Sequence, residues 1–173
     1  MLIGMSPMWT VVVNIFVWLF FHLSISYAAF RVPLEYFQQG SALYTERSWE
    51  QGGRFYEKVF RIKSWKGLLP DGGDVFTGGF AKKHLAAKDS AYLQVFVAES
   101  RRAELTHYGV MLPAPLFFVW NEPWVGGIML LYAAAVNLPC ILAQRYNRIR
   151  LNRVLNRMKR PVENLNLKNY KQL

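Results

Sequence analysis

The sequence predicts an all-α integral membrane protein with about three transmembrane helices and further basic amphipathic helices at the membrane surface. Hydrophobic residues make up 53% of the 173 residues, which is high for a water-soluble domain of this size. These residues gather in long runs, and none of the 21 Lys and Arg residues falls within residues 1–30 or 103–144. Separation of apolar runs from basic segments is typical of a chain whose cations all stay on one side of a bilayer.

The length and charge of the chain limit its class and its partners. We expect residues 1–173 to form a single membrane-embedded domain. The net charge of +10 would suit nucleic acid or an anionic membrane surface, and the placement of the basic residues favours the membrane and no nucleic acid. Cys140 is the single cysteine and lies in an apolar run, so we interpret it as a small hydrophobic residue rather than a metal ligand.

The first predicted transmembrane span covers residues 8–30, which is about the length that a spanning helix requires. A cleaved signal peptide is the alternative, because small residues occur near Ala28, but the basic start of such peptides is missing. With Arg31 directly after the span, the positive-inside rule places the N-terminus outside the cell.

A basic amphipathic helix is expected between Trp49 and Lys66, after a surface connection over residues 31–48. Phe55, Val59 and Ile62 repeat at helical spacing among several Lys and Arg residues. Such a helix can lie in the headgroup plane of the membrane, or its aromatic stripe can pack against a protein core.

Glycine pairs between residues 67 and 80 predict a loop with tight turns and lack the Lys and Ser or Thr of a nucleotide-binding loop. His84 follows as a second candidate imidazole, although its spacing favours a solvated loop histidine. Asp89 or Ser90 is expected to cap the next helix.

That helix ends in the polar run from Glu99 to Tyr108, which is the most informative stretch of the chain. On a helix, residues three or four apart share a face, so Glu99 should pair with Arg102. By the same spacing, Arg101, Glu104, His107 and Tyr108 should share one stripe. Ionisable groups beside hydrocarbon are expensive, and function is the usual reason to keep them.

Two further apolar segments, residues 105–120 and 125–143, predict a helical hairpin around a polar turn. The first either crosses with a proline kink or re-enters the membrane. Crossing gives a multi-pass protein with a cytoplasmic C-terminus. Leu151, Val154, Leu155 and Met158 then predict a second basic amphipathic helix along the membrane, followed by a disordered tail over residues 161–173.

The polar residues allow an acyl-transfer site with His107 as the general base and Glu104 as the carboxylate that orients it. A metal site is one alternative, since Glu-x-x-His also occurs in ferritin-like bundles, but there the motif normally occurs twice. A simple interfacial ion pair that anchors the helix is the other. We expect the following polar residues to contact the substrates: His84, Glu99, Arg101, Arg102, Asn137, Arg145, Asn147 and Arg148.

Three blocks of the sequence resemble the bacterial glycosyl-4,4'-diaponeurosporenoate acyltransferase family. They are Phe55-Tyr56-Glu57 through Ile62–Lys66, then Arg102–Tyr108, then Asn137–Pro139 with Gln144–Leu151. The resemblance implies a cell-membrane enzyme that esterifies the sugar of a glycosylated C30 carotenoid with a fatty acyl chain, the last step towards staphyloxanthin-type pigments. We expect a membrane lipid environment, an acyl-CoA or acyl carrier protein as the fatty acyl donor, and no cofactor. The competing hypothesis is a non-catalytic membrane scaffold for other pigment or lipid enzymes.

Overall fold

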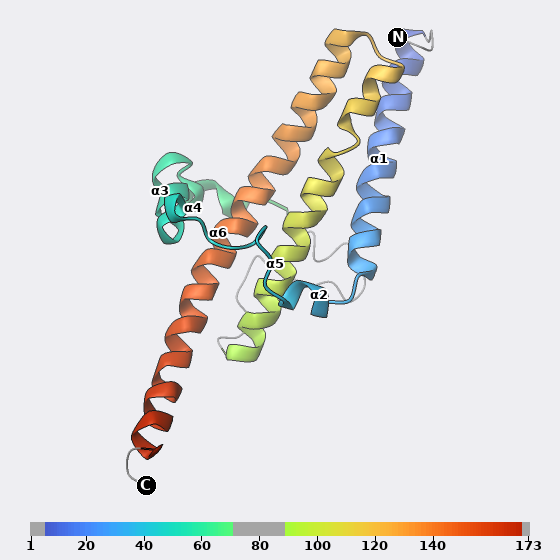
Figure 1. The fold of residues 1–173 in the computed structure, drawn as a ribbon. Helices are drawn as coiled ribbons and strands as arrows, with labels where there is room; N and C mark the ends of the chain where they lie inside the picture. The colour runs from blue at the N-terminus through green and yellow to red at the C-terminus, as the bar shows by residue number, and fades with distance from the viewer. Residues whose placement is uncertain (1–5, 71–88, 171–173) are drawn as a thin grey trace.

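The computed structural model describes residues 6–70 and 89–170, and the side chains up to residue 159; this part of the chain is helical and contains no β-strand. Three long helices dominate it: α1 (Pro7–Arg31), α5 (Ser90–Met111) and α6 (Pro123–Tyr170). Helix α5 packs between the other two, and α1 ends and α5 begins toward the same end of the molecule (Figure 1). The N-terminus and the start of α6 lie together at the opposite end.

Two of these helices are long and apolar enough to cross a membrane, α1 and the part of α6 from Pro123 to Lys159. They contain the predicted spans at residues 8–30 and 125–143. The predicted span at residues 105–120 is not one continuous α-helix, because α5 ends at Met111 and a 3-10 helix, η4 (Ala114–Val119), follows Pro113. Proline lacks an amide hydrogen and cannot continue the helical ladder. A third crossing by this segment stays a prediction.

Helix α6 is a single rod of 48 residues, which differs from the prediction of a separate helix lying along the membrane after residue 150. The apolar face of this part is used inside the protein, since Leu155 is buried against Leu93 and Val97 of α5. Packing against α5 therefore keeps the two parts of α6 in line. Of the tail predicted at residues 161–173, the part up to Tyr170 belongs to α6, and the rest lies outside the described residues.

The predicted amphipathic helix between Trp49 and Lys66 was wrong as a continuous element. The structure has short pieces instead: η1 (Ser48–Gly53), α3 (Arg54–Val59), α4 (Ile62–Trp65) and η2 (Lys66–Leu68). Gly52, Gly53 and Arg61 have positive φ angles of 68°, 93° and 48°, and a residue in the left-handed region interrupts a right-handed helix.

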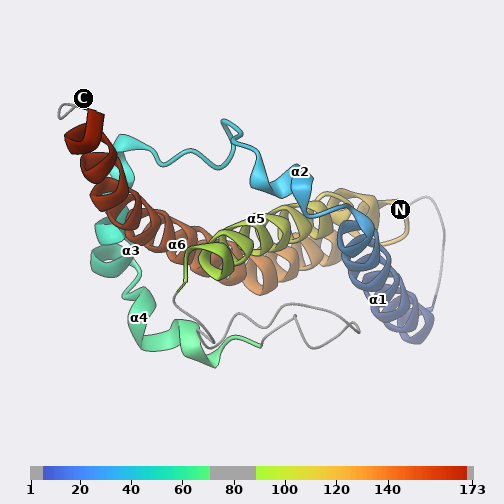
Figure 2. The ribbon, with the colours of Figure 1, turned by 90° about the horizontal axis from the view of Figure 1, so that it is seen from below.

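The aromatic stripe of this region packs against protein. Tyr56 and Ile62 are buried against Tyr146 and Ile149 of α6, which is the alternative that the sequence left open. Figure 2 shows α3 and α4 on one side of the long helices, and α2 (Glu35–Gln38) with the connection around it on the other side. The two connections therefore lie on opposite sides of the α5–α6 pair, away from the end of the molecule that carries the N-terminus.

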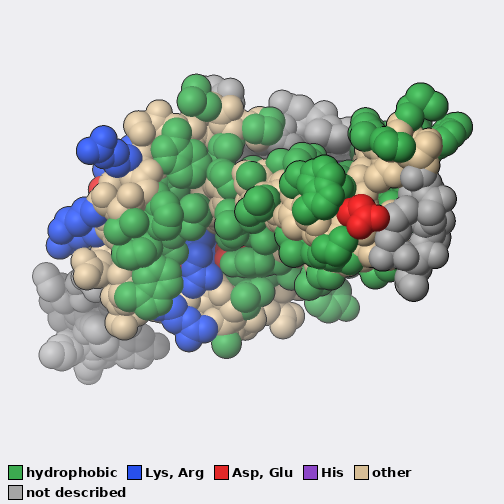
Figure 3. Space-filling view, turned by 90° about the horizontal axis from the view of Figure 1, so that it is seen from above, with side chains coloured by type: hydrophobic (Ala, Val, Ile, Leu, Met, Phe, Trp, Pro, Cys, Tyr) green, Lys and Arg blue, Asp and Glu red, His purple; other side chains and the backbone are tan. Residues whose placement is uncertain are grey.

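A second core holds α1 against the other helices near the start of α6. Trp18 stacks on Phe117 with the ring centroids 4.6 Å apart, and both are buried with Val110 and Ala133. Seen from this end, the surface is mostly hydrophobic, and Lys and Arg are confined to one side of it (Figure 3).

Candidate active site

His107 and Asn137 meet at the centre of the α5–α6 interface. His107 Nδ1 lies 2.9 Å from Asn137 Oδ1, although 30 residues separate them along the chain. Asn137 is fully buried and His107 is half-buried. The imidazole therefore has a fixed partner on Nδ1 and is not fully buried. The sequence indicated both residues, but their contact depends on how α5 and α6 pack.

The hydrogen bonds of Asn137 define the tautomer of His107. The Asn137 Nδ2 donates to the carbonyl of Ala133 at 2.9 Å, so the amide oxygen is the atom that faces the imidazole. An amide oxygen only accepts, and therefore Nδ1 of a neutral His107 carries the proton. In this tautomer Nε2 carries the lone pair, which is the form that a general base needs.

One turn before His107, Glu104 belongs to a group of four charged residues that we call the buried ion-pair cluster: Glu50, Glu104, Arg145 and Arg148. One carboxylate oxygen of Glu104 accepts from Arg145 at 3.2 Å and the other accepts from Arg148. Arg145 also donates to Glu50, at 2.6 Å through Nε. Two carboxylates thus balance two guanidinium groups. Removing one carboxylate or one guanidinium group would leave a buried charge without a partner.

This arrangement differs from the expected role of Glu104 as the residue that orients His107. The oxygens of Glu104 contact arginines, and the contact on Nδ1 of His107 comes from Asn137. The physical reason is charge: a buried carboxylate gains more from a guanidinium than from a neutral imidazole. An uncharged amide is left to orient the ring.

Arg148 retains hydrogen-bonding capacity. Its side chain is fully buried, and its Nε and Nη2 atoms have no hydrogen-bond partner within the described part of the chain. Its guanidinium lies 5.2 Å from the ring centroid of Tyr44, and that of Arg101 lies 5.5 Å from the same ring. Buried donors without partners are costly. Arg148 therefore has two donor atoms for which the described residues supply no acceptor.

The other arginines expected at the site hold the polypeptide together. Arg101 donates to three successive carbonyl groups over residues 37–39 at 2.7–3.1 Å. Arg102 pairs with Glu99 at 2.9 Å, as the spacing predicts, and also donates to the carbonyl of Val32. These contacts fasten the connection after α1 to α5, so both arginines have a structural task beside any contact with substrate.

Two more predicted site residues lie apart from His107 or outside the described residues. Asn147 accepts a hydrogen bond from Lys66 at 2.6 Å, which joins η2 to α6. His84 lies in the segment over residues 71–88, which falls outside the described residues. Among the residues that are described, no group of three or more His, Cys, Asp and Glu side chains could hold a metal ion.

Sequence reasoning missed Glu50, Tyr44 and Tyr56. Glu50 is fully buried and accepts a hydrogen bond from the hydroxyl group of Tyr56, and Tyr44 lies between two guanidinium groups. The available signal was weak, because Glu50 is one of three acidic residues, with Glu46 and Glu57, in and before a basic segment. Its partner, Arg145, is 95 residues away, so local spacing could not pair them.

The buried carboxylate of Glu50 makes the free energy of unfolding sensitive to acid. Burial alone would raise its pKa, but hydrogen bonds from Arg145, the Arg47 amide and Tyr56 outweigh burial and hold the pKa below the usual value. The stabilisation by this charge is therefore complete above pH 4.5, the ordinary value for glutamate, and is lost as the pH falls through the lower pKa of the folded state.

We expect the thermal unfolding temperature of the purified protein to fall as the pH drops below 4.5. Glu50→Gln should unfold at a lower temperature than the wild type at pH 7 and show a smaller further decrease on acidification. Differential scanning calorimetry of both proteins in one detergent measures this. Equal decreases in the two proteins would contradict the role given to Glu50.

Comparison with known proteins places the chain among proteins of one family. The family model described as glycosyl-4,4'-diaponeurosporenoate acyltransferase matches residues 40–157. Proteins of that name from Staphylococcus aureus strains are similar to the chain. The protein of strain bovine RF122 / ET3-1 is 33% identical over 143 residues, 83% of this chain and 86% of its own length. The protein of strain Newman is 32% identical over 146 residues, which are 84% of this chain and 88% of its own length. No solved structure matches the chain significantly.

Proposed function

Because the chain belongs to the glycosyl-4,4'-diaponeurosporenoate acyltransferase family, we propose that it esterifies the sugar hydroxyl of a glycosylated C30 carotenoid with a fatty acyl chain. The observation that carries this proposal is the contact between His107 and Asn137. Both residues lie within residues 40–157, which the family model matches. A histidine with one fixed tautomer is the group that this chemistry requires.

In the proposed reaction, Nε2 of His107 takes the proton from a sugar hydroxyl group. The hydroxyl oxygen attacks the carbonyl carbon of the acyl donor and forms the new C–O bond. The tetrahedral intermediate then collapses, its C–S bond breaks, and the imidazolium returns its proton to the leaving thiolate of the donor, acyl-CoA or acyl carrier protein, which departs as the thiol. Asn137 holds the ring by accepting from Nδ1–H throughout. His107 is thus unchanged after one turnover.

The buried ion-pair cluster is proposed to position the sugar. Three of its members lie on the same two helices as His107 and Asn137, Glu50 comes from η1, and Glu104 is one turn from His107 on α5. Arg148 has two donor atoms without a partner in the described residues, and a sugar oxygen would satisfy them. Arg145 is occupied by Glu50 and Glu104 and keeps the cluster neutral. Asn147, Arg101, Arg102 and Glu99 would act through the connections that they hold in place.

We further propose a multi-pass protein of the cell membrane with its C-terminus in the cytoplasm. Two helices have the length and hydropathy for crossing, and η4 runs beside α1 toward the end of the molecule where α6 begins (Figure 1). The described Lys and Arg residues belong to the opposite half, which the positive-inside rule assigns to the cytoplasm. His107 then lies near the inner boundary of the hydrocarbon, where a membrane-dissolved acceptor and an acyl donor can meet.

Reconstitution of the purified protein in lipid nanodiscs with glycosyl-4,4'-diaponeurosporenoate tests the proposed function. We expect an ester to form when acyl-CoA or acylated acyl carrier protein is added, detected by mass spectrometry of the extracted pigment. Protein-free nanodiscs are the control. Absence of ester with both donors would contradict the enzymatic proposal and favour a scaffold, which forms no ester alone.

A further inference from the structure

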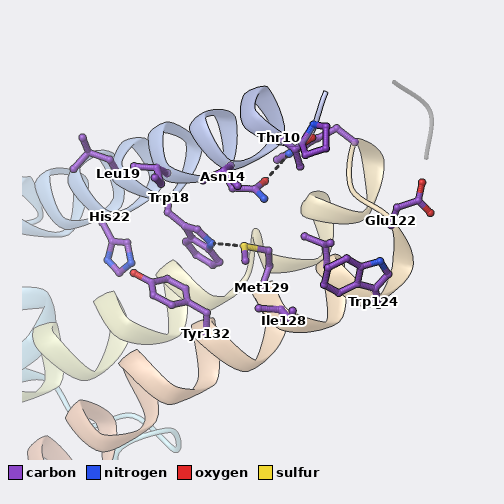
Figure 4. A pocket seen from close by; sticks show the side chains of 15 residues that line it. Thr10, Asn14, Trp18, Leu19, His22, Glu122, Trp124, Ile128, Met129 and Tyr132 are labelled. Carbon is purple, nitrogen blue, oxygen red and sulfur yellow. Dashed lines mark hydrogen bonds between the residues drawn. The ribbon is translucent and has the colours of Figure 1, made fainter. Parts of the chain in front are cut away.

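A groove of about 970 Å³ runs between α1 and the first part of α6, apart from the ion-pair cluster. It is at the upper end of the volume range of small-molecule sites. Figure 4 shows its length: Thr10, Glu122 and Trp124 lie at one end, and His22 and Tyr132 face each other at the other. Helix α1 and the first part of α6 form its walls, and the two helices meet where Trp18 contacts Met129 and Tyr132.

Apolar and aromatic side chains form most of the lining. Trp18 is fixed on the wall by stacking on Phe117, and its indole nitrogen donates to the sulfur of Met129 at 3.3 Å. Trp120 is fixed by a hydrogen bond to Asn14 at 2.8 Å. Indole rings held in this way form a rigid wall that needs no reorganisation when a ligand arrives.

The groove runs along the helices, and His107 and Asn137 lie beyond its inner end in the direction of the helix axes. Along α1 its lining extends from Pro7 to His22, about 22 Å at 1.5 Å per residue. From Tyr132 at its inner end to Asn137, α6 rises by about 7 Å. A straight molecule with one end in the groove and the other at His107 would thus span about 30 Å, the thickness of the hydrocarbon core.

We propose that this groove binds the polyene of the glycosylated carotenoid acceptor and presents its sugar to His107. The inference rests on the proposed function. A conjugated C30 chain is a stiff rod, and a straight groove with fixed indole walls fits a rod without the loss of conformational entropy that ordering a flexible acyl chain would cost. The lipid-facing side is open, since Ile15, Leu19 and Ile128 are exposed, so the acceptor enters sideways from the bilayer.

A polar feature lies where the polyene would end. Nε2 of His22 is a buried atom without a hydrogen-bond partner in the described part of the chain. The acceptor is by its name a glycosyl ester of a polyene carboxylic acid, so the boundary between rod and sugar carries an ester carbonyl. An imidazole N–H at the inner end of the groove can donate to that carbonyl. A fatty acyl chain in the same groove would offer only methylene groups.

Two matched substitutions on α6 test the groove. Ile128 lines it and is 46% exposed, whereas Leu130 lies outside it and is 41% exposed. Ile128→Trp should raise the KM for glycosyl-4,4'-diaponeurosporenoate about tenfold by filling the groove, without changing the KM for the acyl donor. Leu130→Trp should leave both values unchanged. Pigment retained per protein after size-exclusion chromatography in detergent provides a readout that does not need turnover.

The possible results separate the groove from the reaction. An increase in the KM for the acyl donor alone would assign the groove to the fatty chain and overturn the proposal, and equal KM values and pigment retention in all three proteins would also overturn it. Wild-type protein that retains pigment, with a loss in Ile128→Trp only, supports the groove even if no ester forms. In that case the proposed function fails and the binding site remains.

Discussion

His107→Ala is expected to slow ester formation by about 10²–10⁴-fold, because the sugar hydroxyl loses the group that accepts its proton. The rate is measured by mass spectrometry of the acylated pigment in nanodiscs. The variant should fold with a stability loss of about 1–3 kcal/mol, because the fully buried Asn137 Oδ1 loses the partner that His107 provides. His107→Gln retains an amide that can donate to Asn137, and it should be as inactive as the alanine variant if proton transfer is the role of the ring.

Cys140→Ala is the matched control for this experiment. Cys140 lies on α6 one turn after Asn137, and its thiol contacts only the carbonyl of Val136 among the described residues. Normal activity in this variant excludes a thiolate nucleophile. Asn137→Ala should cause a smaller loss, in kcat rather than KM, because the ring then loses its orientation but keeps its nitrogen. Near-normal activity of a folded His107→Ala protein would remove His107 from the mechanism.

The largest expected effect on stability follows from Glu104→Ala. This change leaves Arg148 without its carboxylate in a fully buried position, and breaking a buried pair in this way typically costs about 3–5 kcal/mol. Thermal unfolding in detergent measures the loss. Glu99→Ala on the same helix is the comparison, because Glu99 has one arginine partner and its pair with Arg102 keeps side-chain exposures of 10% and 14%, so this change should lower the unfolding temperature less than Glu104→Ala does.

A double variant separates the unpaired charge from lost packing. Replacing both Glu104 and Arg148 with methionine removes the two charges together, and apolar replacement of a buried pair is often tolerated. The double variant should therefore unfold at a higher temperature than Glu104→Ala. If Glu104→Ala and Glu99→Ala unfold at the same temperature, the cluster does not stabilise the fold as described.

Features of the fold that depend on neighbours along one helix could be predicted from the sequence. The Glu99–Arg102 pair and the cap by Asp89, whose side chain accepts from the amide of Tyr92, follow from spacing within α5. The apolar length of α1 and of the first part of α6 likewise defined both candidate spans. These interactions are local, and the sequence pattern contains the information that they need.

Long-range pairings could not be predicted in the same way. Glu104 was expected to orient His107, but its two carboxylate oxygens accept hydrogen bonds from two arginines that lie more than 40 residues away along the chain. The region around Gly52 looked helical because periodicity shows spacing and not backbone angles, and positive φ values break it. The continuity of α6 beyond residue 143 was not predicted either. The spacing of Leu155 is equally consistent with a residue facing lipid, and only the packing of α5 against it shows that it is buried in the protein.

The length of α6 gives the enzyme a fixed ruler. A helix of 48 residues extends for about 72 Å, more than twice the thickness of a hydrocarbon core. Asn137 and Arg148 both lie on this one continuous helix. Helix geometry alone therefore sets the distance between them along the axis and the angle between them around it. Acyl transfer would consequently occur at one level of the leaflet, and a shift of the rod would displace the imidazole's partner and the spare guanidinium donors together.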